Sequence, residues 1–160
     1  MKNFNIRGAN KQDMPAVFAM IRELAEYEKE PDAVVFDEGE FLDTIFKQKR
    51  ANILVAEING ALVGYAIYFY SFSTWLGKAG IYLEDLYVKP EFRAKGIGKA
   101  FFKELANKCA KDGLGRLEWA CLHWNEPSIK FYESLNANNQ SKEWRVYRLE
   151  GESLDKLKSV

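Results

Sequence analysis

The stretch YLEDLYVKPEFRAKGIG, residues 82–98, carries the clearest structural signal in the chain. Its first part, through Val88, reads as a strand, and its second part places Gly96 and Gly98 where a loop turns into a helix. Basic residues surround these glycines: Lys89, Arg93, Lys95 and Lys99. Cations near a helix N-terminus oppose the positive end of the helix dipole, so this placement is unfavourable unless an anion binds there. Because glycines also let backbone N–H groups approach a ligand closely, the stretch predicts a phosphate or pyrophosphate site.

Two common nucleotide-binding loops do not fit this stretch. A Walker loop needs Ser or Thr after its Gly-Lys pair, and Gly98-Lys99 is followed by Ala100. A dinucleotide-binding fingerprint needs a small residue three positions after Gly98, where Phe101 stands, and a tighter turn between strand and glycines. The predicted anion site therefore belongs to another class of loop.

The rest of the chain predicts strands and helices on both sides of this stretch. Asn59-Gly60 is typical of a tight hairpin turn, here between strands 53–58 and 62–72. Further strands are expected near 4–6 and over 81–88, 117–122 and 144–149, and helices from about 11 and over 41–46, 99–111 and 127–135. Hairpins followed by a strand–helix–strand unit predict one α/β domain over residues 1–160. Its sheet is expected to be mixed, mostly antiparallel and twisted, with about six or seven strands and helices on both faces.

Composition narrows the possible functions. Of the 160 residues, 48% are hydrophobic, which suits a packed core, and 23 basic residues balance 23 acidic ones. A neutral chain gives no case for binding nucleic acid or an anionic membrane. Two cysteines and one histidine are too few for a structural zinc site or a disulfide framework, so no metal is expected. With no signal-peptide pattern and no apolar run of about 20 residues, we expect a soluble, cytoplasmic protein without membrane contact.

The spacing Arg93-x-x-Gly96-x-Gly98 resembles the pyrophosphate loop of the GNAT acetyltransferase superfamily, in which this segment wraps the diphosphate of coenzyme A. The preceding strand end, residues 85–88, and the later Asn125 and Tyr132 strengthen the resemblance, which covers nearly the whole chain. Four segments resemble the diamine branch, the spermidine/spermine acetyltransferases and their thialysine-acetylating relatives: residues 23–28, 75–78, 82–88 and 124–132. The resemblance implies a single GNAT-type domain that uses acetyl-CoA.

The resemblance also assigns roles to individual residues. Cofactor contacts would come from Leu86, Tyr87, Val88, Arg93, Ala94, Lys95, Gly96, Ile97, Gly98, Lys99, Asn125 and Ser128. Contacts to the amine substrate would come from Tyr27, Glu28, Trp75, Glu84 and Asp85. Two positions depart from the family pattern. Ser73 stands where many members have an acid, which weakens the polyamine assignment, and Asn136 replaces a usual glycine but tolerates the same left-handed backbone.

Acetyl transfer to an amine sets three chemical demands. The amine must lose a proton, the thioester oxygen must be stabilised as it becomes anionic, and the thiolate must gain a proton. Glu84 and Asp85 are adjacent on a strand, so we expect them to face opposite sides of the sheet, with only one in a given cleft. The resemblance favours Glu84 as the base, acting through water, and Tyr132 as the acid, with the Val88 N–H as oxyanion donor.

The leading hypothesis is therefore an N-acetyltransferase that acts on a primary amine of a small di- or polyamine or a lysine-like amino acid. One alternative within the same class is acetylation of a protein N-terminus or lysine, which would suit a broad, open groove. An alternative from another class is a non-catalytic module that binds acetyl-CoA. The family often forms two-fold dimers, so the resemblance also leads us to expect a homodimer.

Overall fold

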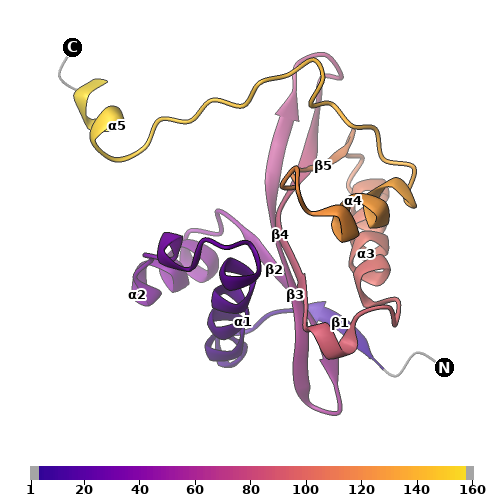
Figure 1. The fold of residues 1–160 in the computed structure, drawn as a ribbon. Coiled ribbons are helices and arrows are strands. Elements are labelled where there is room, and N and C mark those ends of the chain that lie inside the picture. The colour runs from indigo at the N-terminus through magenta and orange to yellow at the C-terminus, as the bar shows by residue number, and fades with distance from the viewer. Residues whose placement is uncertain (1–3, 158–160) are drawn as a thin grey trace. The chain divides into compact units, whose positions relative to one another are not determined.

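A computed structural model describes residues 4–157, in which five strands form one open sheet in sequence order (Figure 1). The strands are β1 (Asn5–Gly8), β2 (Asn52–Ile58), β3 (Ala61–Ser73), β4 (Lys78–Val88) and β5 (Leu117–Trp119). Neighbours from β1 to β4 are antiparallel, and β4 pairs with β5 in parallel. The predicted class, an α/β domain with a mixed and mostly antiparallel sheet, is confirmed, whereas the sheet of the described residues has fewer strands than expected.

Local sequence signals set two of the main boundaries. The hairpin between β2 and β3 turns at Asn59 and Gly60, both with positive φ (49° and 82°), as the Asn-Gly pair predicts. Shortly after β1, Asn10 accepts a hydrogen bond from the Gln12 N–H at 2.8 Å and starts the turn that leads into α1. These two short polar motifs set the turn between β2 and β3 and the start of the first helical segment.

Helices cover both faces of the sheet in the larger part of the chain. The 3₁₀ turn Lys11–Asp13 leads into α1 (Met14–Tyr27), and α2 (Glu38–Leu42) continues into a π-helical turn (Asp43–Lys47). Figure 1 shows α1 and α2 on one face and α3 (Ile97–Lys111) on the other. Among the described residues, none of these helices is long and apolar enough to cross a membrane.

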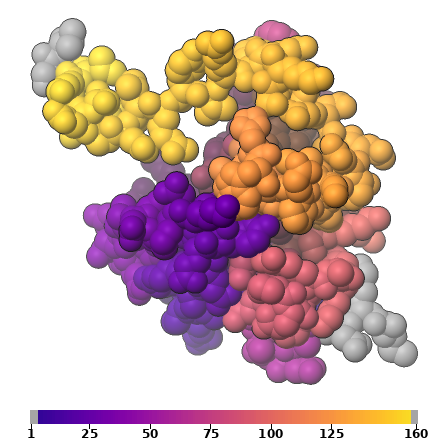
Figure 2. Space-filling model, in the orientation of Figure 1, coloured from indigo at the N-terminus to yellow at the C-terminus, as the bar shows by residue number. Residues whose placement is uncertain are grey.

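The core lies mainly between α1 and the sheet. Buried residues of α1, including Val17 and Phe18, pack against Val55 of β2 and Tyr65 of β3. The ring of Phe18 contacts those of Phe36 and Phe41, each with centroids 5.2 Å away, so α2 joins the same core. The space-filling view shows these first segments, in indigo and violet, packed as one block (Figure 2). This packing holds the C-terminal end of α1 over β3 and β4.

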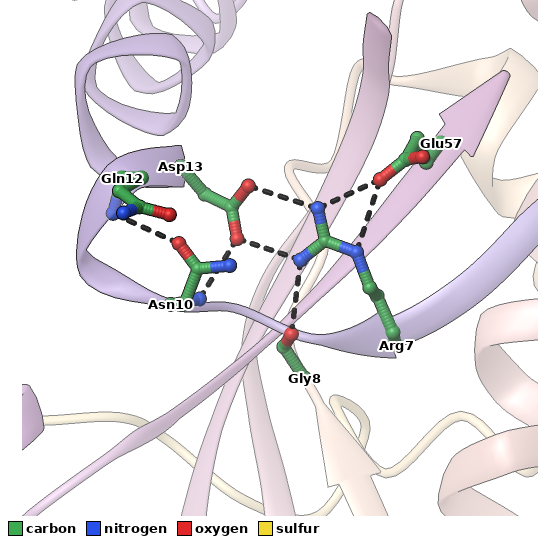
Figure 3. A network of polar contacts seen from close by, with 6 residues as sticks. All are labelled: Arg7, Gly8, Asn10, Gln12, Asp13 and Glu57. Atoms are coloured by element: carbon green, nitrogen blue, oxygen red, sulfur yellow. Dashed lines mark hydrogen bonds and ion pairs between the residues drawn. The ribbon is translucent and has the colours of Figure 1, made fainter. Parts of the chain in front are cut away.

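An ion-pair network ties β1 to the 3₁₀ turn before α1 and to β2 (Figure 3). The Arg7 guanidinium donates to both oxygens of Asp13, at 2.7 and 2.9 Å, and to Glu57 Oε2 at 2.7 and 3.0 Å. Asp13 also accepts from the Asn10 N–H at 2.8 Å and so closes the turn before α1. A single guanidinium thus forms charge-assisted hydrogen bonds with both carboxylates, and these bonds join the three segments.

The chain divides into a larger unit that ends at Ala120 and a smaller one that begins at Cys121. The smaller unit holds α4 (Glu126–Glu133) and α5 (Gly151–Leu157). The predicted strand over 144–149 is wrong: this segment is irregular, and its Val146 is 89% exposed. The predicted strand 117–122 is also shorter, since β5 ends at Trp119. An alternating apolar pattern gives a segment one apolar face, but a strand also needs a neighbour for its backbone hydrogen bonds.

Candidate active site

A β-bulge interrupts β4 at the pair of adjacent acids. Asp85 lies opposite Ile67 of β3, and Leu83 lies opposite Tyr68, so Glu84 has no partner on β3. A bulge adds one residue to a strand and breaks the strict alternation of side chains. The expectation that Glu84 and Asp85 must face opposite sides therefore does not hold, because it assumes a regular strand.

Asp85 lies on the face of the sheet that α1 covers. Its partner Ile67 belongs to the core beneath α1, and directly opposite residues of an antiparallel pair share a face. The Tyr65 hydroxyl, from a fully buried side chain, donates to Asp85 Oδ2 at 3.1 Å. Asp85 itself is half-buried and Glu84 is exposed. The two acids of the bulge thus have different surroundings.

Burial raises the pKa of Asp85 to about 6. This net value includes the opposing effect of the hydrogen bond from Tyr65, which lowers the pKa, and smaller rises caused by the negative charges of Glu84 and Glu28. Glu28 follows the last residue of α1, is half-buried, and has a pKa raised by burial. The end of α1 and the bulge of β4 therefore bring three carboxylates together, and the two that are half-buried hold protons more tightly than usual.

A second polar group lies beside this cluster. The Tyr87 hydroxyl donates to Glu23 Oε2 at 2.9 Å, and Lys89 Nζ lies 3.7 Å from Glu23 Oε1. Burial is the largest cause that raises the pKa of Tyr87 to about 12, followed by the bond and charge of Glu23. This group connects α1 to the end of β4 and has a cation of its own.

The predicted anion loop connects β4 to α3. A 3₁₀ turn (Pro90–Phe92) follows the strand, Ala94 and Gly96 have positive φ (59° and 82°), and Gly96 caps α3. The first helical hydrogen bond runs from the Ala100 N–H to the Gly96 carbonyl at 3.0 Å, so the three preceding amides have no partner within the helix. The loop therefore has the backbone donors that the sequence predicted for an anion.

The cations of the loop are partly engaged with the protein. Arg93 Nε donates to the Val88 carbonyl at 2.8 Å, and the guanidinium carbon lies 5.1 Å from the Tyr27 ring centroid and 5.6 Å from that of Tyr87. Lys95 Nζ donates to the Glu91 carbonyl at 2.9 Å. Arg93 thereby joins the anion loop to Tyr27 at the end of α1, a contact that the sequence did not predict.

The strands β3 and β4 come very close together just before this loop, at Val88. Val88 lies opposite Gly64 of β3, and a Cβ at Gly64 would meet the Tyr87 carbonyl oxygen at 2.7 Å. Leu86 and Val88 are half-buried and Tyr87 is buried. The glycine keeps β3 and β4 close just before the anion loop begins.

The remaining predicted residues lie apart from this cluster or in the smaller unit. Trp75, in the β3–β4 turn, is 86% exposed, and Ser73 is buried and accepts from the Leu76 N–H at 3.2 Å. In the smaller unit, the buried Asn125 caps α4 by accepting from the Ser128 N–H at 3.4 Å, and Tyr132 is half-buried on α4. The predicted cofactor and catalytic roles of these α4 residues stay predictions.

Sequence reasoning missed Tyr65 as a member of the site. Its place in a run of apolar and aromatic residues indicates core, and its hydroxyl partner is 20 positions away. The Asn59-Gly60 turn would allow β2 and β3 to be aligned, but no comparable signal gives the position of the bulge in β4. The pairing of Tyr65 with Asp85 depends on that register.

Comparisons with known proteins agree with the fold and identify a family. The sequence model of the Acetyltransferase (GNAT) family matches residues 17–137. Thialysine N-epsilon-acetyltransferase of Bos taurus is 39% identical, with 95% of each chain covered. Spermidine/spermine N(1)-acetyltransferase-like protein 1 of Homo sapiens is 32% identical over 96% of this chain, which is 24% of that protein. A Vibrio cholerae integron cassette protein, VCH_CASS6, is 25% identical in a solved structure, with a TM-score of 0.82 and 99% of each chain covered.

Proposed function

The chain belongs to the GNAT acetyltransferase family and is an N-acetyltransferase, and from that premise we propose that it acetylates the side-chain amine of a lysine-like amino acid. The observation that carries the proposal is the cluster of Glu28, at the end of α1, with Glu84 and Asp85, at the bulge of β4. An alkylamine with a pKa near 10.4 is a cation at neutral pH, and a group of carboxylates attracts and orients such a cation.

Acetyl-CoA would supply the activated acetyl group, and the chain has a fitting cradle for its diphosphate. The left-handed Gly96 and the unpaired amides of the first turn of α3 suit a phosphate, and Lys99 adds charge at the same helix end. We assign Arg93 through Lys99 to the diphosphate and Leu86 through Val88 to the pantetheine arm. Asn125 and Ser128 complete the proposed cofactor contacts.

The chemical roles proposed from the family resemblance are divided between two elements. Tyr132 would return a proton to the departing thiolate, and the Val88 N–H would donate to the oxygen that becomes anionic. Glu84 and Tyr27 would form the approach for the amine, and Trp75, in the β3–β4 turn, is a further predicted substrate contact. These roles fit one catalytic domain over 1–160, since the match to the family runs across the boundary at Ala120.

The surroundings of Ser73 support a lysine-like amine over a longer polyamine. Many polyamine-acetylating relatives are expected to have an acid at this position, and here Ser73 is buried and bonded to the Leu76 N–H. The best-covered relatives include thialysine acetyltransferases, with 34% identity over 98% of each chain for that of Caenorhabditis elegans. A polyamine is the second candidate because a spermidine/spermine acetyltransferase-like protein is also a relative.

The test is a thiol-release assay with acetyl-CoA across thialysine, lysine, ornithine, spermidine and putrescine. We expect kcat/KM for the best lysine-like amino acid to exceed that for spermidine at least tenfold, a difference of about 1.4 kcal/mol in transition-state binding. A preference for spermidine would assign the chain to the polyamines instead. Peptides with free N-termini or lysines serve as the third arm, and turnover confined to them would favour a protein acetyltransferase.

A thermal-shift measurement covers the non-catalytic alternative. Coenzyme A at 100 times its dissociation constant should stabilise the protein by about 2.7 kcal/mol. Stabilisation without thiol release from any amine would indicate a binding module. No stabilisation at all would contradict the assignment of the anion loop. Sedimentation of the same sample measures whether the expected homodimer forms.

A further inference from the structure

The Tyr65–Asp85 pair is the most deeply placed polar contact in the acidic cluster. Tyr65 has no exposed surface, and its hydroxyl points its proton at Asp85 Oδ2 over 3.1 Å. Ile67, a core residue, lies opposite Asp85 on β3, so Asp85 lies on the core side of the sheet. This leaves Asp85 with one fixed hydrogen bond on one oxygen.

Asp85 has no cationic partner among the described residues. None of the causes that shift its pKa is a cation, and the neighbouring charges are the carboxylates of Glu84 and Glu28. Glu23, by contrast, has both the Tyr87 hydroxyl and Lys89 Nζ as partners. A half-buried carboxylate among other carboxylates is stabilised most by a proton or by a cationic ligand.

Resting on the proposed function, we infer that Asp85 is the group that takes the proton from the substrate's ammonium, and that Tyr65 positions it for this step. Asp85 is then a catalytic residue and Tyr65 a positioning residue. Glu84 and Glu28 attract the ammonium but do not accept its proton.

The proton and electron pairs balance in this assignment. The ammonium gives one proton to the Asp85 carboxylate and becomes a neutral amine with a free electron pair. That pair forms the C–N bond to the acetyl carbon of acetyl-CoA, the C–S bond breaks, and the electron pair of that bond leaves on the thiolate. The amide nitrogen loses its second proton and the thiolate gains one, so the net release is the single proton that Asp85 passes to water.

The surroundings suit Asp85 to this role better than Glu84. Glu84 is exposed at the bulge, where water screens its charge. The pKa of Asp85 is raised to about 6, closer to neutral pH than that of an ordinary aspartate, and a general base is most efficient when its pKa lies near the working pH. The groups that face Asp85 are Tyr65 from β3, Glu84 from β4 and Glu28 from the end of α1.

The test compares Asp85→Asn, Tyr65→Phe and the control Tyr68→Phe, each against the wild type over pH 5 to 10 with the best amine. Asp85→Asn should lower kcat at least 100-fold near pH 7, and the loss should shrink as pH rises toward the pKa of the free amine. Tyr65→Phe should move the acidic limb of kcat/KM to higher pH, because its hydrogen bond lowers the pKa of Asp85.

Tyr68→Phe is matched because it also removes a buried tyrosine hydroxyl from β3. Tyr68 is 5% exposed and alternates with Ile67, so it lies on the α3 face, away from Asp85. Its acidic limb should coincide with that of the wild type. A purely structural role for Tyr65 would lower Tm in both variants without moving the limb.

Two results would overturn the inference. One is an unmoved acidic limb in Tyr65→Phe, which deletes a single oxygen and tests the pair even where Asp85→Asn does not fold. The other is an Asp85→Asn activity within threefold of wild type at pH 7, together with the loss of the acidic limb of the kcat/KM profile in Glu84→Gln. That result would make Glu84 the base. Wild-type turnover of amines establishes the proposed function separately, so either result leaves that function intact.

Discussion

The carboxylates of the Arg7 network and the carboxylate of Asp85 are all half-buried but have opposite electrostatic surroundings. Both carboxylate oxygens of Asp13 accept from Arg7, Oδ2 also accepts from the Asn10 N–H, and the pKa of Asp13 is lowered chiefly by the hydrogen bond from Arg7 (Figure 3). Asp85 has a neutral hydroxyl as its partner, and burial raises its pKa to about 6. The net charge of the chain is zero, so the local partners of each acid, not the overall charge, cause this difference.

The difference separates an acid that is paired with a cation of the fold from one whose pKa no cation of the described residues lowers. A carboxylate saturated by a guanidinium has little affinity left for a proton or a ligand. A half-buried carboxylate without a cation is destabilising by itself and gains most from a cationic substrate. The three predictions below test this contrast through folding stability, from the largest expected effect to the smallest.

Arg7→Ala should destabilise the folded protein by about 3 kcal/mol at pH 7, because it leaves the nearly buried Asp13 and the half-buried Glu57 without their cation. Equilibrium urea unfolding measures the change. The pKa of Asp13 is lowered in the folded state, so its contribution is present above the ordinary aspartate range and disappears as pH falls. The gap between wild type and variant should therefore narrow below about pH 4.

The expected consequence for catalysis is small, since Arg7 contacts none of the proposed site residues. A gap that stays constant down to pH 3 would contradict the view that Arg7 acts through Asp13.

Asp85→Asn should have the opposite sign and stabilise the folded protein at pH 7 by about 2 kcal/mol. Folded Asp85 binds a proton more tightly than unfolded Asp85, so the wild type loses stability as pH rises through about 6. The asparagine keeps an acceptor for the Tyr65 hydroxyl and carries no charge. Thermal and urea unfolding at pH 7 and pH 4 measure the effect, which should largely vanish at the lower pH.

A variant that is less stable than wild type at pH 7 would show that Asp85 has a compensating partner, and the contrast with Asp13 would fail.

Glu38→Gln should produce the smallest effect, below about 0.5 kcal/mol. Glu38 accepts from Arg22 at 3.1 Å, an Arg–Glu pair like that of Arg7 and Glu57, but both side chains are more than half exposed. Solvent screens such a pair, so burial rather than pairing alone should separate it from the Arg7 network. Urea unfolding in low and high salt measures it, and an effect near that of Arg7→Ala would contradict the role given to burial.

Short-range signals predicted much of the fold correctly. The Asn59-Gly60 turn, the helix after Asn10 and the Gly96 start of α3 depend on backbone angles and caps that neighbouring residues determine. The strand over 144–149 was wrong, because pairing depends on a partner elsewhere in the chain. The alternation of Glu84 and Asp85 failed for a related reason, since a bulge is a property of two paired strands.

The sequence by itself determined the family, the anion loop and the acids at the end of α1 and in β4, because each depends on residue type and spacing along the chain. Only the tertiary structure decided which of the two adjacent acids is half-buried, which hydroxyl it faces, and that Arg93 contacts Tyr27. Burial and the register between β3 and β4 set these contacts. Both arise from residues far apart in the chain, so no local pattern contains them.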